Sequence, residues 1–183
     1  RQLCSGLAAA HDAGVVHRDF KSSNILLVPS PDGERAVITD FGLARSSHQS
    51  SDGITITQAG GLLGTPAYMA PEQVAGIPAN AGSDLYALGV VLYEMLTGAL
   101  PFHGESPLEV AVKRLREPPT PIETYRAGLS ARFRETIERC MAREPEKRFA
   151  RADEVIRFLD PPTALLGADR LRGERPSRNL VTG

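Results

Sequence analysis

Cysteine, lysine and long apolar runs are all scarce in this chain of 183 residues, and each shortage excludes a class of protein. The two cysteines, Cys4 and Cys140, lie on segments that we expect to be separate helices, which argues against a disulfide framework. We interpret both as buried thiols of a protein in the reducing cytoplasm. Lysine occurs only at positions 21, 113 and 147, so a lysine inside a polar cluster is more informative here than in a lysine-rich chain.

Membrane insertion and nucleic-acid binding are also disfavoured by what the chain lacks. The longest apolar run, residues 87–100, is too short to cross a bilayer and contains Glu94. No secretory signal opens the chain. The formal net charge of −1 gives no bulk field that would attract nucleic acid or an anionic membrane. The sequence therefore predicts a cytoplasmic protein with no membrane segment and no nucleic-acid partner.

Apolar periodicity predicts a mostly helical domain over residues 1–160. Residues 1–12 have the pattern of a helix that Gly14 ends as a left-handed cap. Residues 81–97 are apolar nearly all round and stop before Gly98, which is typical of a helix buried in the middle of a bundle. Serine caps and renewed periodicity predict three more helices, over residues 107–117, 131–143 and 152–159.

The remaining segments predict one hairpin, one long loop and a tail. Short β-prone runs occur at residues 15–16, 25–28 and 36–39, and the last two flank a Pro- and Gly-rich turn, which favours a hairpin. Residues 43–64 are rich in Ser, Thr and Gly, and we expect a long, mobile and functional loop there. In residues 161–183 the periodicity fades, which indicates a disordered tail or linker with at most a weak helix over 163–172.

Polar residues gather in three short clusters whose order is the most informative feature of the chain. The clusters are His17-Arg18-Asp19 with Lys21 and Asn24, then Asp40-Phe41-Gly42, then Ala70-Pro71-Glu72. Over residues 1–160 this order and spacing resemble the carboxy-terminal lobe of a eukaryotic-type protein kinase. The wording of residues 68–73 and 84–86 is most similar to the bacterial Ser/Thr kinase branch. One such tripeptide alone would be weak evidence, whereas unrelated chains have no reason to reproduce all of them in this order.

The resemblance implies a fold, a reaction and a missing part. The implied fold is mainly α within an α+β family, a helical bundle with a small β-hairpin layer beside the catalytic loop. The implied reaction is ATP-dependent phosphorylation of protein Ser and Thr hydroxyls, with Mg²⁺ or Mn²⁺ as the metal. The family's amino-terminal lobe, with its Gly-rich loop and strand lysine, is absent from residues 1–16. We therefore expect the 183-residue chain alone to be nearly inactive. We also expect the face left by the missing lobe to promote self-association.

Five residues receive roles in the chemistry from this resemblance. Asp19 is the candidate base, which orients the acceptor hydroxyl and takes its proton late in the transfer. Lys21 places a positive charge on the γ-phosphate. Asn24 and Asp40 are the candidate metal ligands, because Mg²⁺ prefers hard oxygen donors. Thr65 resembles the residue that bridges Asp19 and Lys21 and favours Ser/Thr substrates.

Nucleotide contact and regulation rest on four further residues. Leu26 resembles the apolar residue beneath the adenine ring, although a place in the hairpin core remains an alternative. Arg18 next to the candidate base implies that a phosphate on the long loop pairs with its guanidinium and orders the loop. Thr55 and Thr57 are the candidate acceptors of that phosphate; the alternative is a Ser/Thr-rich loop without modification.

The remaining matches are interpreted as structural. They are His17 with Phe41, which stack in an apolar column; Asp84, which bonds the backbone of the catalytic loop; and Glu72 with Arg148, a buried ion pair that braces the substrate-binding segment. One departure from the family is Ala87, where serine is frequent.

Two other functions remain open. A catalytically inert scaffold or binding module is disfavoured because it has no need for the complete set of candidate catalytic residues. A small-molecule phosphotransferase shares related Asp clusters, but the Ala-Pro-Glu segment and the long Ser/Thr loop favour a protein substrate.

Overall fold

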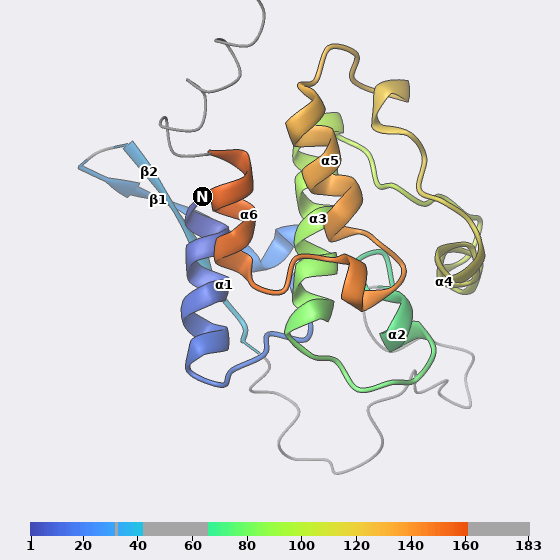
Figure 1. Cartoon of the computed structure of the whole chain (residues 1–183), viewed down its shortest axis with the longest axis horizontal. Helices are drawn as coiled ribbons and strands as arrows, with labels where there is room; N and C mark the ends of the chain where they lie inside the picture. Colours follow the sequence, from blue (N-terminus) through green and yellow to red (C-terminus); the bar gives the residue numbers. More distant parts are fainter. Residues whose placement is uncertain (32, 42–65, 161–183) are drawn as a thin grey trace, which may run out of the picture.

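The computed structural model describes residues 1–31, 33–41 and 66–160, which form a helical body with a two-stranded sheet at one side (Figure 1). The helix α3 runs through the middle, α5 packs along it, and α1 lies beside α6 and against β2. The elements in chain order are α1 (Gln2–Asp12), η1 (Ser22–Asn24), β1 (Ile25–Ser30), β2 (Gly33–Ile38), α2 (Pro71–Val74), α3 (Ala81–Thr97), α4 (Pro107–Arg116), η3 (Ile122–Thr124), α5 (Ala131–Cys140), η4 (Pro145–Lys147) and α6 (Ala152–Leu159).

The helix α3 is the core of the body, as its all-round apolar pattern predicts. Residues 83–91 are all buried, and apolar clusters lie on two sides of the helix. Gly98 ends it with a φ of 70°, a left-handed conformation that glycine adopts without strain. A Cβ at Gly89 would lie 2.7 Å from the Cβ of Cys140, so glycine is what lets α5 approach this closely. Cys140 and Cys4 are both buried and free, as expected from the sequence.

The hairpin is longer than the sequence predicts. The strands pair antiparallel from Ile25 opposite Ile38 to Ser30 opposite Gly33, so both extend into the segment interpreted as a turn. Ile25 and Ile38 pack against the core, whereas the side chains of Leu26 and Leu27 are 51% and 63% exposed. The β-prone pair 15–16 belongs to no strand.

The end of one helix and the cap of another differ from the prediction, and both differences have local causes. The helix α5 ends at Cys140 rather than at residue 143. The carbonyl oxygens of Ala142 and Arg143 accept hydrogen bonds from Arg148, at 2.8 and 3.1 Å, which turns the chain away from the helix axis. At the start of α4, Ser106 caps the Glu109 N–H as expected, but the Glu109 carboxylate accepts from the N–H of Glu105 instead of closing the capping box.

No helix within the described ranges has the length and apolar character needed to span a membrane.

Candidate active site

The backbone turn that precedes Asp19 is held by the carboxylate of Asp84, which lies in the first turn of α3. Its two oxygens accept the N–H groups of His17 and Arg18, each at 2.8 Å, and Nε2 of His11 lies 2.8 Å from Oδ2. Arg18 has a φ of 68°, a left-handed conformation that is unfavourable for a residue with a side chain. Asp84 thus stabilises a strained turn, and its place near a helix N-terminus favours its negative charge.

Asp19, Lys21 and Asn24 meet directly after this turn. The Lys21 ammonium donates to Oδ2 of Asp19 at 2.7 Å, and the Asn24 amide nitrogen donates to the Asp19 carbonyl oxygen at 3.0 Å. The Asp19 side chain is 53% exposed, so a substrate can reach its carboxylate. Asn24 is buried by the turn η1, and its donor group is already engaged, which leaves its amide oxygen as the group that can approach a cation.

The hairpin returns Asp40 to the same end of the sheet. The N–H of Thr39 donates to the carbonyl oxygen of Asn24 at 2.9 Å, directly beyond the last strand pair, Ile25 with Ile38. Asp40 follows with an exposed side chain and a φ of 58°. A second residue in this unfavourable region is typical of a site whose geometry is set by function.

The His17 side chain connects the loop of residues 17–21 to the end of the hairpin. Its Nε2 lies 2.9 Å from the Thr39 carbonyl oxygen, to which it can donate. The fully buried ring lies 4.8 Å from the ring of Phe41 and 5.5 Å from that of Phe20, centroid to centroid. The structure thus brings His17 and Phe41 together, with their rings tilted by 42°, and their structural role remains a prediction.

The donor set at this end of the sheet fits magnesium better than a transition metal. Asn24 contributes an amide oxygen and Asp40 a carboxylate, the hard donors that Mg²⁺ accepts while it keeps water and phosphate oxygens as further ligands. Within residues 1–31, 33–41 and 66–160, no group of three or more His, Cys, Asp or Glu side chains is arranged to hold a metal ion.

Glu72 of α2 and Arg148 form a buried ion pair with two hydrogen bonds. Both Nη1–Oε1 and Nη2–Oε2 are 2.7 Å apart, and Ser83 donates to Oε1 at 2.8 Å. Arg148 also donates to the Gly82 carbonyl oxygen at 2.9 Å, and its guanidinium lies 5.1 Å from the ring centroid of Tyr86. Burial alone would raise the pKa of Glu72, but the hydrogen bonds and charge of Arg148 hold it below its ordinary value.

Three more polar residues join the hydrogen-bond network around residues 17–24, although the sequence analysis gave them no role. The Tyr68 hydroxyl lies 2.9 Å from the Ser22 hydroxyl and donates to Glu94 at 2.7 Å; burial, followed by the Glu94 hydrogen bond, raises its pKa to about 12. Gln73 donates to the Arg18 carbonyl oxygen at 3.1 Å. The third is His11, described above. The only signal for His11 in the sequence is a polar ring at the end of an Ala-rich helix.

Leu26 and the side chain of Arg18 take no part in this network, although the Arg18 backbone does. The side chain of Leu26 is half exposed, which excludes a place in the hairpin core and leaves adenine contact as a prediction. Arg18 is exposed. Thr55, Thr57 and Thr65 lie outside the described residues, so their roles remain predictions.

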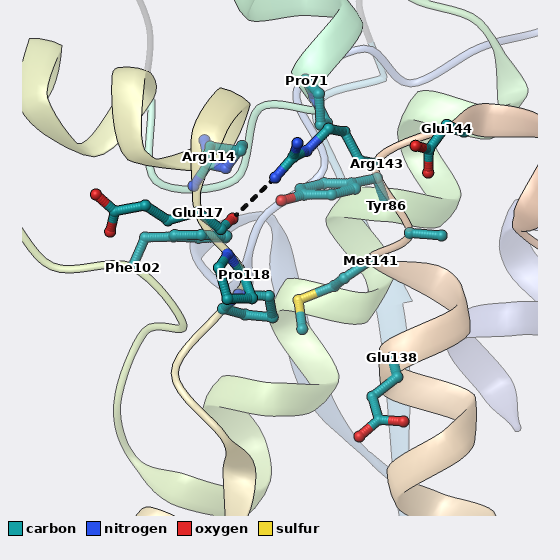
Figure 2. Close-up of a pocket in the computed structure, with 12 residues that line it drawn as sticks. Pro71, Tyr86, Phe102, Arg114, Glu117, Pro118, Glu138, Met141, Arg143 and Glu144 are labelled. Atoms are coloured by element: carbon teal, nitrogen blue, oxygen red, sulfur yellow. Dashed lines mark hydrogen bonds between the residues drawn. The ribbon is translucent and has the colours of Figure 1, made fainter.

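A pocket of about 320 Å³ lies beside this network, between α2, α3, α4 and the end of α5 (Figure 2). Pro71, Tyr86, Phe102, Arg114 and Met141 are among the residues that line it. Figure 2 shows Arg143 reaching across its upper side to the Glu117 carbonyl oxygen, at 3.4 Å. None of the candidate base, lysine or metal ligands lines the pocket, and nothing in the sequence analysis predicted it.

The chain is similar in sequence to known proteins. Residues 1–157 match the family model described as "Protein kinase domain". The chain is 40% identical over 161 residues to a probable serine/threonine-protein kinase PknB of Corynebacterium glutamicum, covering 86% of this chain and 24% of that protein. It is 40% identical over 167 residues to the serine/threonine-protein kinase PknB of Mycobacterium tuberculosis, covering 88% of this chain and 26% of that protein.

A third relative, the serine/threonine-protein kinase pkn3 of Myxococcus xanthus, is 41% identical over 157 residues, which is 83% of this chain and 28% of that protein. The chain thus spans about a quarter of the length of the curated relatives it matches.

Proposed function

This chain belongs to the protein kinase domain family, and on that premise we propose that it is the carboxy-terminal catalytic lobe of a Ser/Thr protein kinase, over residues 1–160. The reaction is transfer of the γ-phosphoryl group of ATP to Ser and Thr hydroxyls of proteins. The observation that carries the proposal is the cluster of Asp19, Lys21 and Asn24 behind the turn that Asp84 holds.

In the proposed reaction the substrate oxygen attacks the γ-phosphorus, the bond to the β-phosphate oxygen breaks, and ADP leaves. Asp19 orients the hydroxyl and accepts its proton, a role that its exposed carboxylate supports. Lys21, 2.7 Å from that carboxylate, is close enough to offset the negative charge on the γ-phosphate. Asn24 and Asp40 would hold Mg²⁺, which neutralises phosphate charge when bound.

The protein substrate would bind along the segment that leads into α2. Glu72 and Arg148 anchor α2 from below, and Gln73 ties it to the catalytic loop through the Arg18 carbonyl oxygen. On the same family pattern, Thr65 bridges the base and the lysine. Leu26 would contact adenine; Arg18, Thr55 and Thr57 would form the regulatory set. Because ATP and free thiols such as those of Cys4 and Cys140 belong to the cytoplasm, we place the domain there.

The family's ATP site also uses a Gly-rich loop and a strand lysine, and these 183 residues contain neither. We expect them alone to transfer phosphate negligibly, which a radiolabel assay on the 183-residue chain tests. The exposed Leu26 and Leu27 support the further proposal that these residues self-associate, to be measured by light scattering.

The deciding experiment measures transfer of radiolabelled γ-phosphate to Ser/Thr peptides by the full-length protein and its D19N variant. Removing the base is expected to reduce kcat by a factor of about 100 or more. Asp12→Asn is the matched control, since Asp12 is an exposed carboxylate that pairs with Arg151 away from the cluster. Full activity in D19N refutes the proposal, and transfer to an aminoglycoside or choline but to no peptide would assign the small-molecule phosphotransferase instead.

A further inference from the structure

Arg114 of α4 is a buried cation whose bonds go to backbone groups. The residue is only 2% exposed. Its guanidinium donates through Nη1 to the carbonyl oxygen of Pro66 and through Nη2 to that of Ala67, the latter at 2.7 Å. Among the described residues no carboxylate forms an ion pair with it, and Nε has no hydrogen-bond partner. The orientation of the guanidinium is therefore set by these two carbonyl groups and by the rings around it.

Two aromatic rings enclose this guanidinium. Its Cζ lies 5.2 Å from the ring centroid of Phe102 and 5.8 Å from that of Tyr86. Figure 2 places Arg114 on the α4 side of the pocket, with Phe102 below it and Tyr86 across from it. Taking a charge out of water is unfavourable, and burial lowers the pKa of Arg114 accordingly. An apolar side chain would fill the same space without that penalty, so the two N–H donors are what an arginine adds here.

The two acceptors lie in the segment that the proposed function assigns to the protein substrate. Pro66 and Ala67 follow Thr65 and precede α2. The rest of the segment is held from its other end, by the Tyr68 hydroxyl and by the Gln73 side chain, which accepts the N–H of Ala70 at 3.0 Å. Among the described residues, Arg114 is thus the side chain that holds Pro66 and Ala67 at the start of this segment, from a helix 47 residues further along the chain.

We propose that Arg114 is a positioning residue for the protein substrate: it fixes the carbonyl groups of Pro66 and Ala67, and with them the backbone against which the substrate peptide binds. This inference rests on the proposed function. Because Arg114 touches none of Asp19, Asn24 or Asp40, its loss changes peptide binding and leaves ATP binding unaltered.

The experiment compares Arg114→Met, Arg114→Lys and the wild type in the full-length protein. Methionine keeps much of the volume but has no donor, and lysine keeps the charge but lacks the two-pronged geometry. For Arg114→Met we expect the KM for peptide to rise about tenfold or more, the size expected for one lost hydrogen bond to a charged group, with the KM for ATP unchanged. Arg114→Lys should lie between. Arg116→Met, an exposed position on the same helix, is the matched control.

A second readout does not depend on activity. Amide hydrogen exchange of residues 67–70 should quicken about tenfold in Arg114→Met while residues 17–24 keep their protection. An active wild type whose Arg114→Met variant keeps its peptide KM and its exchange rates refutes the inference alone. Equal rises in both KM values, with a lowered Tm, also refute it, because they indicate a merely structural residue. A wild type that phosphorylates no peptide refutes the proposed function, whatever the exchange data show.

Discussion

Replacing Arg148 by methionine should destabilise the domain more than any surface change. The arginine donates to both oxygens of Glu72 and to the carbonyl oxygens of Gly82, Ala142 and Arg143. Its side chain is fully buried and that of Glu72 is 6% exposed, so water cannot replace these bonds. Removing one partner of such a pair costs about 3–5 kcal/mol, because the other charge stays buried without compensation. That is a large part of the about 5–15 kcal/mol that stabilises a typical domain.

Urea unfolding followed by far-UV circular dichroism measures this loss, since the chain has no tryptophan to report by fluorescence. With an ordinary slope the midpoint should fall by about 2 M. The double variant Arg148→Met with Glu72→Met should be less destabilised than the sum of the two single variants, because it buries no unpaired charge. Arg151→Met, which breaks an exposed pair with Asp12, is the control and should leave the midpoint unchanged. A loss below about 1 kcal/mol for Arg148→Met, or strict additivity in the double variant, would refute this reasoning.

Three further predictions follow from the same contacts. Gly89→Ala places a Cβ 2.7 Å from that of Cys140, so it should lower the free energy of unfolding by about 1–3 kcal/mol, measured as a fall in Tm. The pKa of Glu72 is lowered in the folded state, so its ion pair stabilises the domain fully above the ordinary pKa of 4.5, and this stabilisation is lost as pH falls through the folded pKa. Glu72→Gln should therefore be less stable at pH 7, and its free energy of unfolding, measured in urea, should change less across the acid range. Asp84→Ala leaves the N–H groups of His17 and Arg18 without their acceptor, and kcat should fall about tenfold or more.

Each of these has a clear opposite result. An unchanged Tm in Gly89→Ala would show that α5 can shift away from α3 without loss. A Glu72→Gln profile parallel to that of the wild type would show that the carboxylate does not titrate with folding. Full kcat in Asp84→Ala would show that the turn at Arg18 holds its shape without the buried carboxylate.

Much of the local structure follows from local sequence. The bounds of α3 and α6 agree with the predicted ranges, 81–97 and 152–159, because apolar periodicity lies within each segment and Asn80 and Gly98 cap α3. The polar clusters also predict which residues meet at the candidate site, since the hairpin between Asn24 and Asp40 is a short-range feature.

What the sequence could not predict depends on side-chain contacts that helix periodicity and caps do not indicate. The end of α5 is set by the side chain of Arg148, which takes the carbonyl groups that would continue the helix. Arg114 lies in a run of basic residues that is typical of an exposed helix face, yet it is buried because Phe102 and Tyr86 enclose it. The contact of His11 with Asp84 joins residues 73 positions apart, and no local pattern indicates it.

The hold of Asp84 on the turn at Arg18 also has a consequence for biosynthesis. The acceptor lies 66 residues after the donor in the chain, so a ribosome exposes the whole candidate catalytic loop long before the group that shapes it. A nascent chain that ends before α3 lacks the Asp84 carboxylate, which offsets the cost of the left-handed conformation of Arg18. The proposed catalytic loop therefore acquires its form only after the central helix has been made and has packed.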